Sequence, residues 1–278
     1  MHNLKGTLRT MVKAAACLAI GVVMLAPFIW MVSTSFKYNW DAISFPPRFL
    51  PTEFAGFGSY KRVLTEIPFA RFLSNSVVVA AAVTAGVLFT SSLAGYIFAK
   101  FNFWGKEQIF LGILATMMIP FQVIVIPVYI LVYQMKMLNT LWALIIPRLV
   151  SAYGIFLMRQ FMSGIPTALI DAARIDGCSE FGIYAKIVLP LSKPALSALG
   201  IFTFMASWDD FLWPLLVLDD MPKRTLPLGL ALFRQQFGMM DWNVIMAGTL
   251  LSILPVLIVF FAAQKNFIEG ITLSGIKG

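Results

Sequence analysis

An uncharged stretch between Arg71 and Lys100 decides the fold class: residues 72–99 read FLSNSVVVAAAVTAGVLFTSSLAGYIFA. An α-helix rises about 1.5 Å per residue, so about 20 residues cross the roughly 30 Å of hydrocarbon in a bilayer. This stretch is longer than that, and its polar residues are uncharged, chiefly Ser and Thr. It therefore predicts a helix that spans a membrane.

Five further apolar stretches extend this pattern along the chain. The spans predicted from them are 14–36, 108–135, 138–158, 194–218 and 242–264. The stretch 14–36 follows a basic start, as in a signal peptide, but its apolar run is too long for one and predicts an uncleaved anchor. We therefore expect an all-α, polytopic membrane protein with six transmembrane helices in a single domain over residues 1–278.

The composition excludes most soluble classes of protein. Of the 278 residues, 59% are hydrophobic and 12% are charged, and the mean hydropathy is +0.84. A soluble domain has roughly a quarter of its residues charged, so this chain fits neither a soluble enzyme nor a disordered protein. One His and two Cys exclude a His-rich metal site, a disulfide framework and a four-cysteine zinc site, so no metal site is predicted.

The charge balance bears on partners and on orientation. The net charge of +8 comes from 21 basic and 13 acidic residues, and the densest basic clusters are the pairs Lys61-Arg62 and Lys223-Arg224. A nucleic-acid-binding protein needs a clustered basic face, so we expect no nucleic-acid partner and contact with anionic membrane lipid instead. Six spans place both termini on one side, and the basic N-terminal arm favours the cytoplasmic side. The predicted location is the cytoplasmic (inner) membrane of a prokaryote.

Two segments on the opposite side of the membrane are too long for simple turns. They are residues 37–71 and 219–241. Prolines and glycines punctuate the first of them, which predicts an ordered loop on the membrane surface rather than a separate domain.

A loop of a different kind, residues 159–193, separates the fourth and fifth spans and reads RQFMSGIPTALIDAARIDGCSEFGIYAKIVLPLSK. Its pattern predicts a short helix over 167–176 that begins at a proline and ends at Gly177. A second helix is expected over 179–189, with Pro190 as its end. Periodicity alone leaves open a pair of interfacial helices that lie on lipid and do nothing else.

Within this loop, Asp171-Ala172-Ala173 is followed after three residues by Gly177 and after nine more by Ile187-Val188-Leu189-Pro190. This spacing resembles the motif E-A-A, three residues, G, nine residues, I-x-L-P of the permease subunits of binding-protein-dependent ABC importers. The departure is Asp171 in place of Glu, which keeps the charge on a shorter side chain. The resemblance implies the type I ABC importer permease fold, with a cytoplasmic coupling-helix loop over residues 159–193.

Two other segments extend the resemblance. Residues 208–215, WDDFLWPL, resemble the family's W-N-[DE]-F-x-x-P-L element, with Asp209 in the place of Asn. Residues 264–278 resemble the tail of the maltose-type, carbohydrate-importing branch, and in particular its smaller, MalG-like subunits. The resemblance therefore implies an importer of sugars, disaccharides or oligosaccharides, with glycerol phosphate or another polar solute as the alternative cargo.

The resemblance also implies how energy reaches this chain. The coupling helix would dock on an ATPase subunit, and ATP-driven closure of the ATPases would switch the spans between inward-open and outward-open states. The residues implied in this coupling are Asp171, Ala172, Ala173, Asp176, Gly177, Ile187, Leu189 and Pro190. Ala172 and Ala173 would present a surface without protruding side chains, which allows close docking. The tail over 274–278 would make a second contact with the ATPase subunit.

No sequence pattern for catalysis accompanies this loop. The phosphate-binding pattern G-x-x-x-x-G-K-[ST] is absent, and the single His is at position 2. We therefore expect a non-catalytic subunit with no cofactor of its own. The implied partners are a second, MalF-like permease subunit, two ATPase subunits that bind ATP and Mg, and an extracytoplasmic sugar-binding protein. An ion-coupled secondary transporter and a membrane scaffold are the alternatives from other classes.

Polar and aromatic residues inside the predicted spans are the candidates for the translocation pathway. They are Gln122, Tyr133, Gln134, Arg148, Tyr153, Trp208, Asp209 and Asp210. An Arg at the centre of a span costs about 2.5–3.5 kcal/mol on insertion scales, so Arg148 is expected to face the bundle, water or an acid. Structural ion pairing for the charged residues and an interfacial aromatic belt for the tryptophans are the alternative interpretations.

Overall fold

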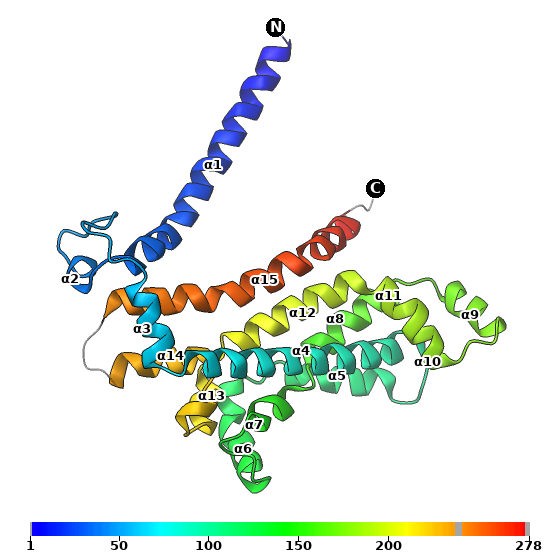
Figure 1. Ribbon diagram of the computed structural model, residues 1–278. Coiled ribbons are helices and arrows are strands. Elements are labelled where there is room, and N and C mark those ends of the chain that lie inside the picture. The colour runs from blue at the N-terminus through cyan, green and yellow to red at the C-terminus, as the bar shows by residue number, and fades with distance from the viewer. Residues whose placement is uncertain (1, 237–240, 276–278) are drawn as a thin grey trace. The chain divides into compact units, whose positions relative to one another are not determined.

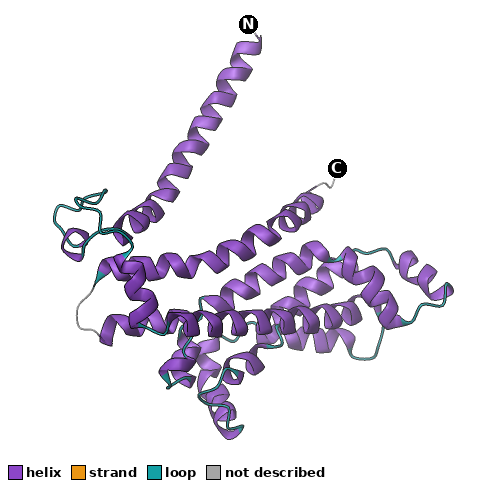
Figure 2. Ribbon diagram, in the orientation of Figure 1, coloured by secondary structure: helices purple, strands orange, loops and turns teal. Residues whose placement is uncertain are grey.

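The computed structural model describes residues 2–236 and 241–275, and these residues form helices joined by turns, with no β-strand among them (Figure 2). The chain divides into two compact units. One unit comprises residues 1–69 and 230–253, and the other comprises residues 70–229 and 254–278. The all-α class predicted from the sequence is confirmed, whereas a single membrane domain over the whole chain stays a prediction.

The first unit contains the N-terminal helix and a short outer connection. Its elements are α1 (His2–Ser35), α2 (Asn39–Ala42), α3 (Gly58–Glu66), the end of α14 (Leu226–Gln236) and the start of α15 (Trp242–Gly275) (Figure 1). Arg62 on α3 donates to Glu66 at 2.8 Å and to Asp241 at 2.6 Å, so it joins α3 to the residue that precedes α15.

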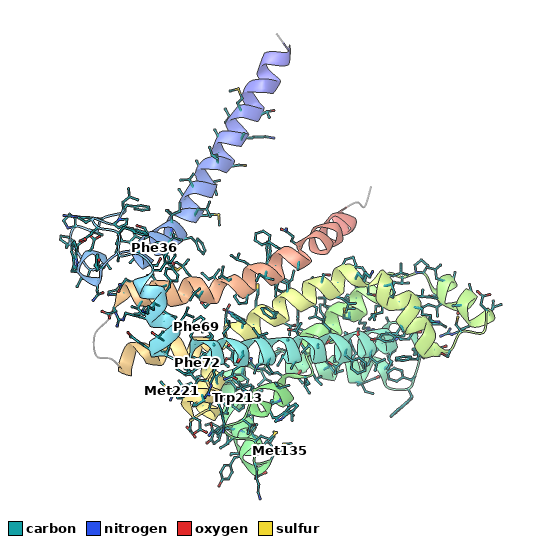
Figure 3. The ribbon with its side chains drawn as sticks, viewed as in Figure 1. Phe36, Phe69, Phe72, Met135, Trp213 and Met221 are labelled. Carbon is teal, nitrogen blue, oxygen red and sulfur yellow. The ribbon has the colours of Figure 1, made fainter. Side chains whose placement is uncertain are left out.

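The segment over residues 36–57, termed the outer segment, is ordered by buried polar groups. Lys37 and Asp41 are each only 1% exposed. The Asp41 carboxylate accepts from Thr52 N at 2.8 Å and from Thr52 Oγ1 at 2.9 Å, and Lys37 Nζ donates to the Arg48 carbonyl. Phe36, which is labelled in Figure 3, stacks on Phe54 at a centroid distance of 5.3 Å. These contacts confirm the ordered, proline-punctuated loop expected here.

The second unit holds most of the chain. Its elements are α4 (Phe69–Lys100), α5 (Lys106–Thr116), α6 (Phe121–Gln134), α7 (Trp142–Ile145), η1 (Ile146–Arg148), α8 (Ala152–Ser163), α9 (Thr167–Ile175), α10 (Glu180–Ile183), η2 (Tyr184–Val188), α11 (Leu189–Leu191), α12 (Lys193–Trp208), α13 (Leu212–Val217) and η3 (Met221–Lys223), with α14 and α15 shared between the units (Figure 1).

Helices α4, α8 and α12 pack closely through small residues. A Cβ at Gly95 on α4 would lie 2.5 Å from the Cβ of Met158 on α8, and a Cβ at Gly154 on α8 would overlap the hydroxyl of Ser91. Met158 and Ser91 are fully buried. Because lipid is as apolar as the side chains, close packing of this kind holds membrane helices together more than apolar burial does.

Among the residues that the structure describes, three helices are long and apolar enough to cross a membrane. They are Thr10–Ser35, Phe69–Lys100 and Trp242–Ala262, which match the predicted spans 14–36, 72–99 and 242–264. Three bent pairs pass the same test of length and composition when each pair is taken as one span. The chain is therefore a multi-pass membrane protein, and the count of six spans stays a prediction.

The predicted spans 108–135 and 138–158 each fall on two helices, Lys106–Thr116 with Phe121–Gln134, bent by 98°, and Trp142–Arg148 with Ala152–Ser163, bent by 42°. The predicted span 194–218 covers most of α12, which ends at Trp208, and all of α13, while a third bend, of 77°, separates Glu180–Leu191 from Lys193–Trp208. Pro120 is extended at φ −60° and ψ 140°, and Ser151 is extended before α8. A proline also disfavours the helical conformation of the residue before it, so local backbone chemistry breaks stretches that hydropathy alone reads as uniform.

Candidate functional site: the coupling loop and a cavity

Helix α9 in the loop 159–193, termed the coupling loop, ends in a glycine-dependent turn. Gly177 has φ +79°, and its N–H donates to the Arg174 carbonyl at 3.0 Å. The next N–H, of Cys178, donates to the Ala173 carbonyl at 2.9 Å. These two bonds form a Schellman motif, which needs a left-handed residue that glycine adopts without steric cost. The prediction that Gly177 ends the helix is confirmed.

The faces of α9 differ sharply in exposure. Ile170 and Ala173 are buried, at 1% and 6% exposed. On the other side, Asp171 and Ala172 are exposed and Ile175 is 86% exposed. The expectation that Ala173 belongs to the exposed docking surface needs correction, because it lies on the packed side of the helix. Sequence reasoning missed Ile175, whose outward position depends on which face the rest of the protein buries.

An ion cluster joins α9 to α10. The Arg174 guanidinium donates to Glu180 Oε1 at 2.6 Å and to Asp171 Oδ1 at 3.1 Å, so the i, i+3 pair expected with Asp171 is present. The hydrogen bond from Arg174 lowers the pKa of Glu180, and the same bond raises the pKa of Arg174. Sequence reasoning also missed Glu180, because it meets Arg174 across the turn at Gly177 and not along one helix.

Three polar contacts tie the coupling loop to α4. Tyr96 Oη donates to Glu180 Oε2 at 3.1 Å, and the hydroxyls of Ser92 and Tyr184 lie 2.7 Å apart. At the C-terminal end of α4, Lys100 Nζ donates to the Ile165 carbonyl. Figure 1 shows α9 and α10 beyond this end of α4. The loop is therefore fastened to a membrane-spanning helix on one side and exposed on the other.

The second helix of the loop runs further than expected. Ser179 caps α10 by accepting from Gly182 N at 3.2 Å, and the chain continues through the π-turn η2 into α11. Pro190 lies inside α11 and does not end the helix, so the predicted boundary was wrong. A π-turn before a proline changes the hydrogen-bond register, which accommodates a residue that lacks an N–H. Ile187 and Leu189 are half-buried in this stretch.

A cavity of about 450 Å³ lies within the second unit. Residues from α4, α6, η1, α8, α12 and α13 line it. Arg148 on η1 pairs with Asp210 at 2.8 Å, as the cost of an unpaired Arg in a span leads one to expect. Trp213 closes one wall, where its Nε1 donates to the Ala143 carbonyl at 2.9 Å and its ring meets Phe121 edge-on at 5.8 Å (Figure 3).

The structure separates the predicted pathway residues into three groups. Arg148 and Tyr153 line the cavity, and Asp210 reaches it through the ion pair. Trp208 is buried and stacks on Phe204. The exposed residues outside the cavity lining are Gln122, Tyr133, Gln134 and Asp209.

Neither part of the site has the groups of a metal centre. Among the residues that the structure describes, no group of three or more His, Cys, Asp or Glu side chains could hold an ion. The tail over 274–278, for which the resemblance implies an ATPase contact, lies partly outside the described residues, since 276–278 are not among them.

Comparisons with known proteins agree with the geometry of the loop and the bundle. Residues 91–272 match the family described as the binding-protein-dependent transport system inner membrane component. The chain is 40% identical over 207 residues to the arabinooligosaccharides transport system permease protein AraQ of Halalkalibacterium halodurans, with 74% of each chain covered. It is 36% identical over 205 residues to the sn-glycerol-3-phosphate transport system permease protein UgpE of Shigella flexneri, with 73% of each covered.

A solved structure shows the same fold. A chain from the crystal structure of a bacterial ABC transporter involved in the import of the acidic polysaccharide alginate superposes with a TM-score of 0.81 at 23% identity. The superposition covers 94% of this chain and 97% of that one. This fold and the family match set aside a secondary transporter and a scaffold. The chain belongs to the binding-protein-dependent transport system inner membrane component family and is a permease subunit of an ABC importer.

Proposed function

We propose that this subunit carries a carbohydrate across the membrane and receives its driving force through the coupling loop. The observation that carries this proposal is the two-sided character of α9: Ile175 and Ala172 are exposed, while Ile170 is packed and the helix is fastened to α4. In this proposal the exposed face of α9, which the packing of its own protein does not use, is the face that docks on another protein. The docking partner in this scheme is an ATPase subunit.

Transmission of movement follows from the contacts behind α9. When the ATPase subunits close on ATP, the docked helix moves with them. Arg174 passes the displacement to Glu180, and Glu180 passes it to Tyr96 on α4. The bond between Ser92 and Tyr184 holds the second helix to the same span. Close-packed elements shift as rigid bodies, so α4 and the helices packed on it would move together between inward-open and outward-open states.

The other coupling residues have supporting parts in this proposal. Asp171 offers an exposed carboxylate to a basic partner, and Asp176 with Gly177 forms the turn that sets the end of the docking surface. The remaining members of the motif shape the second helix around the π-turn, and these are Ile187, Leu189 and Pro190. Ala173 acts from the packed side of α9, where its small side chain allows the helix to lie close to its own protein.

The proposed assembly contains a second permease subunit, two ATPase subunits that bind ATP and Mg, and an extracytoplasmic binding protein. This chain contributes one membrane domain of six spans and has no catalytic or cofactor-binding role. Its termini and the coupling loop lie in the cytoplasm of a prokaryote, a placement supported by the basic N-terminal arm and the excess of Lys and Arg on that side.

Sugar is the proposed cargo because of the arabinooligosaccharide relative and the resemblance of the tail to carbohydrate importers. Glycerol phosphate is the second candidate, favoured by the glycerol-3-phosphate relative. The two cargoes can be separated by purifying the complete importer, reconstituting it with its binding protein and measuring ATP hydrolysis against a panel of neutral sugars and glycerol 3-phosphate. Stimulation by neutral sugars supports the first cargo, and stimulation by glycerol 3-phosphate alone supports the second.

Cross-linking tests the coupling role directly. The exposed cysteines Cys17 and Cys178 are first replaced by Ala, and a single Cys is placed at Ala172. A bifunctional thiol reagent should then capture the ATP-hydrolysing subunit, and ATP should change the yield. The matched control places the Cys at Ile43, which is 59% exposed in the outer segment and should capture no ATPase. Equal yields from the two positions would contradict the proposal.

A further inference from the structure

We infer that the cavity of this subunit is itself a binding site for an uncharged, hydroxyl-rich solute, because the Arg148–Asp210 pair cancels the fixed charge that the cavity would otherwise present. The inference rests on the proposed function and narrows it, since it assigns substrate contacts to this chain and a charge class to the cargo.

The charge of the cavity is set by one ion pair. Arg148 is the one residue with a fixed charge among the described residues that line it, and its Nη2 lies 2.8 Å from Asp210 Oδ2. The two side chains are 29% and 13% exposed, so water screens their fields only partly. An unpaired guanidinium in this position would attract phosphate or carboxylate groups. With Asp210 beside it, the guanidinium keeps N–H groups to donate but offers no net positive charge.

Hydroxyl side chains also line the cavity. Tyr153 and Thr203 contribute hydroxyls that can both donate and accept, which suits a sugar hydroxyl. The Ser207 oxygen has no hydrogen-bond partner in the described part of the chain, but it is buried and does not face the cavity directly. By contrast, Ser151 in the same lining is already used, because it accepts from Gly154 N at 3.1 Å.

The remaining wall and the size fit the same class of ligand. Aromatic rings from α6, α8, α12 and α13 line the cavity, and they are Phe121, Tyr153, Phe202 and Trp213. Ligand pockets combine such apolar and aromatic surfaces with a few placed polar groups, and they measure about 300–1,000 Å³. At about 450 Å³, this cavity lies within that range. Apolar faces with paired charges and hydroxyls favour a neutral sugar over an anion such as glycerol phosphate.

The rate at which charged reagents reach the cavity tests its charge. In the complete purified importer, with Cys17 and Cys178 replaced by Ala, Thr203→Cys places a half-buried thiol in the lining. Its modification by sulfonate-bearing and trimethylammonium-bearing methanethiosulfonates gives a ratio of anionic to cationic rates. Asp210→Asn should raise this ratio at least tenfold, because the uncancelled positive charge of Arg148 speeds the anionic reagent and slows the cationic one.

Two further variants test whether misfolding, and not charge, causes a change in the rate ratio. Arg148→Gln should lower the ratio, because it leaves Asp210 unpaired, and the double variant Arg148→Gln/Asp210→Asn should return the ratio to within about twofold of the parent. A general disturbance of the fold would change both reagent rates together and would not reverse in the double variant. A ratio that stays unchanged in Asp210→Asn, or that fails to return in the double variant, would overturn the inference.

Protection of the thiol tests the ligand class. Neutral probes (arabinotriose, maltotriose and lactose) and anionic probes (glycerol 3-phosphate and digalacturonate) are added before the reagents. At least one neutral probe should slow modification of the Thr203→Cys parent, and the anionic probes should slow it only in Asp210→Asn. Protection of the parent by anionic probes alone, or by none, would overturn the inference. The cross-link at Ala172 is independent of these rates, so failure of the coupling role and failure of the cavity assignment remain distinguishable.

Discussion

The outer segment and the coupling loop are both irregular, polar connections, but they treat their charges in opposite ways, while both leave apolar side chains exposed. In the outer segment, Lys37 and Asp41 are 1% exposed and are satisfied by the segment's own backbone and side chains. In the coupling loop, Asp171 and Arg174 stay exposed, and Ile175 is left 86% exposed.

The exposure of these charges indicates the role of each connection. A buried charge needs hydrogen-bond or ionic partners. The outer segment supplies these partners from its own residues. A loop whose charges stay in water keeps them available to the charged groups of another protein. The coupling loop is therefore open to a charged partner, whereas the buried charges of the outer segment hold its own shape.

The largest effect should come from placing a charge on the exposed side chain of α9. Ile175→Asp should reduce copurification of the ATPase subunits at least tenfold, because docking would bury an unpaired carboxylate. Because Ile175 is already exposed, the variant should insert and fold normally, as judged by its elution in gel filtration. The matched control is Ile43→Asp in the outer segment, which should leave copurification unchanged. Equal losses in the two variants would contradict the docking role of the exposed face of α9.

A smaller effect should come from the turn that ends α9. Gly177 adopts φ +79°, and no atom lies within 4 Å of the place where its Cβ would be. The cost of a substitution there is therefore backbone strain and not a clash, about 1–2 kcal/mol for an L-residue. Gly177→Val should lower uptake and ATP hydrolysis several-fold while the chain still inserts in the membrane.

Asn at the same position separates strain from bulk. Asn adopts the left-handed conformation more readily than other non-glycine residues, so Gly177→Asn should retain most of the activity in the same assay of binding-protein-stimulated ATP hydrolysis. If the Val and Asn variants lost equal activity, the left-handed turn would not be the property that matters, and the side chain itself would be blocking the docking surface.

The same contrast explains how much of the site could be predicted from the sequence. The end of α9 was predictable because Gly177 and the Asp171–Arg174 pair act over a few residues of one helix. The contact between Tyr96 and Glu180 joins residues 84 positions apart, so no local pattern indicates it. The inward position of Ala173 was not predictable either, since the packing of the whole unit decides which face of a short helix is covered.

Hydropathy also predicted only part of the membrane-spanning structure. It located the three uninterrupted helices well because length and apolarity suffice for them. It could not show the break before Pro120, which falls within an apolar region, whereas α12 ends where the sequence has two acidic residues, Asp209 and Asp210. The cost of an unpaired Arg led to the expectation that Arg148 faces the bundle, water or an acid, but the choice of Asp210 over Asp209 depends on the turn between α12 and α13.

The smallest effect concerns the pH dependence of the outer segment, where the carboxylate of Asp41 is buried. Hydrogen bonds from Thr52 hold the pKa of Asp41 below its usual value. A carboxyl with a lowered folded-state pKa contributes stability that is complete above its unfolded pKa, about 3.9, and is lost as the pH falls through the folded value. Limited proteolysis of the outer segment should therefore accelerate below about pH 4. Asp41→Asn should remove most of this pH dependence, and cleavage of the coupling loop, whose Asp171 is exposed, should respond less to Asp171→Asn.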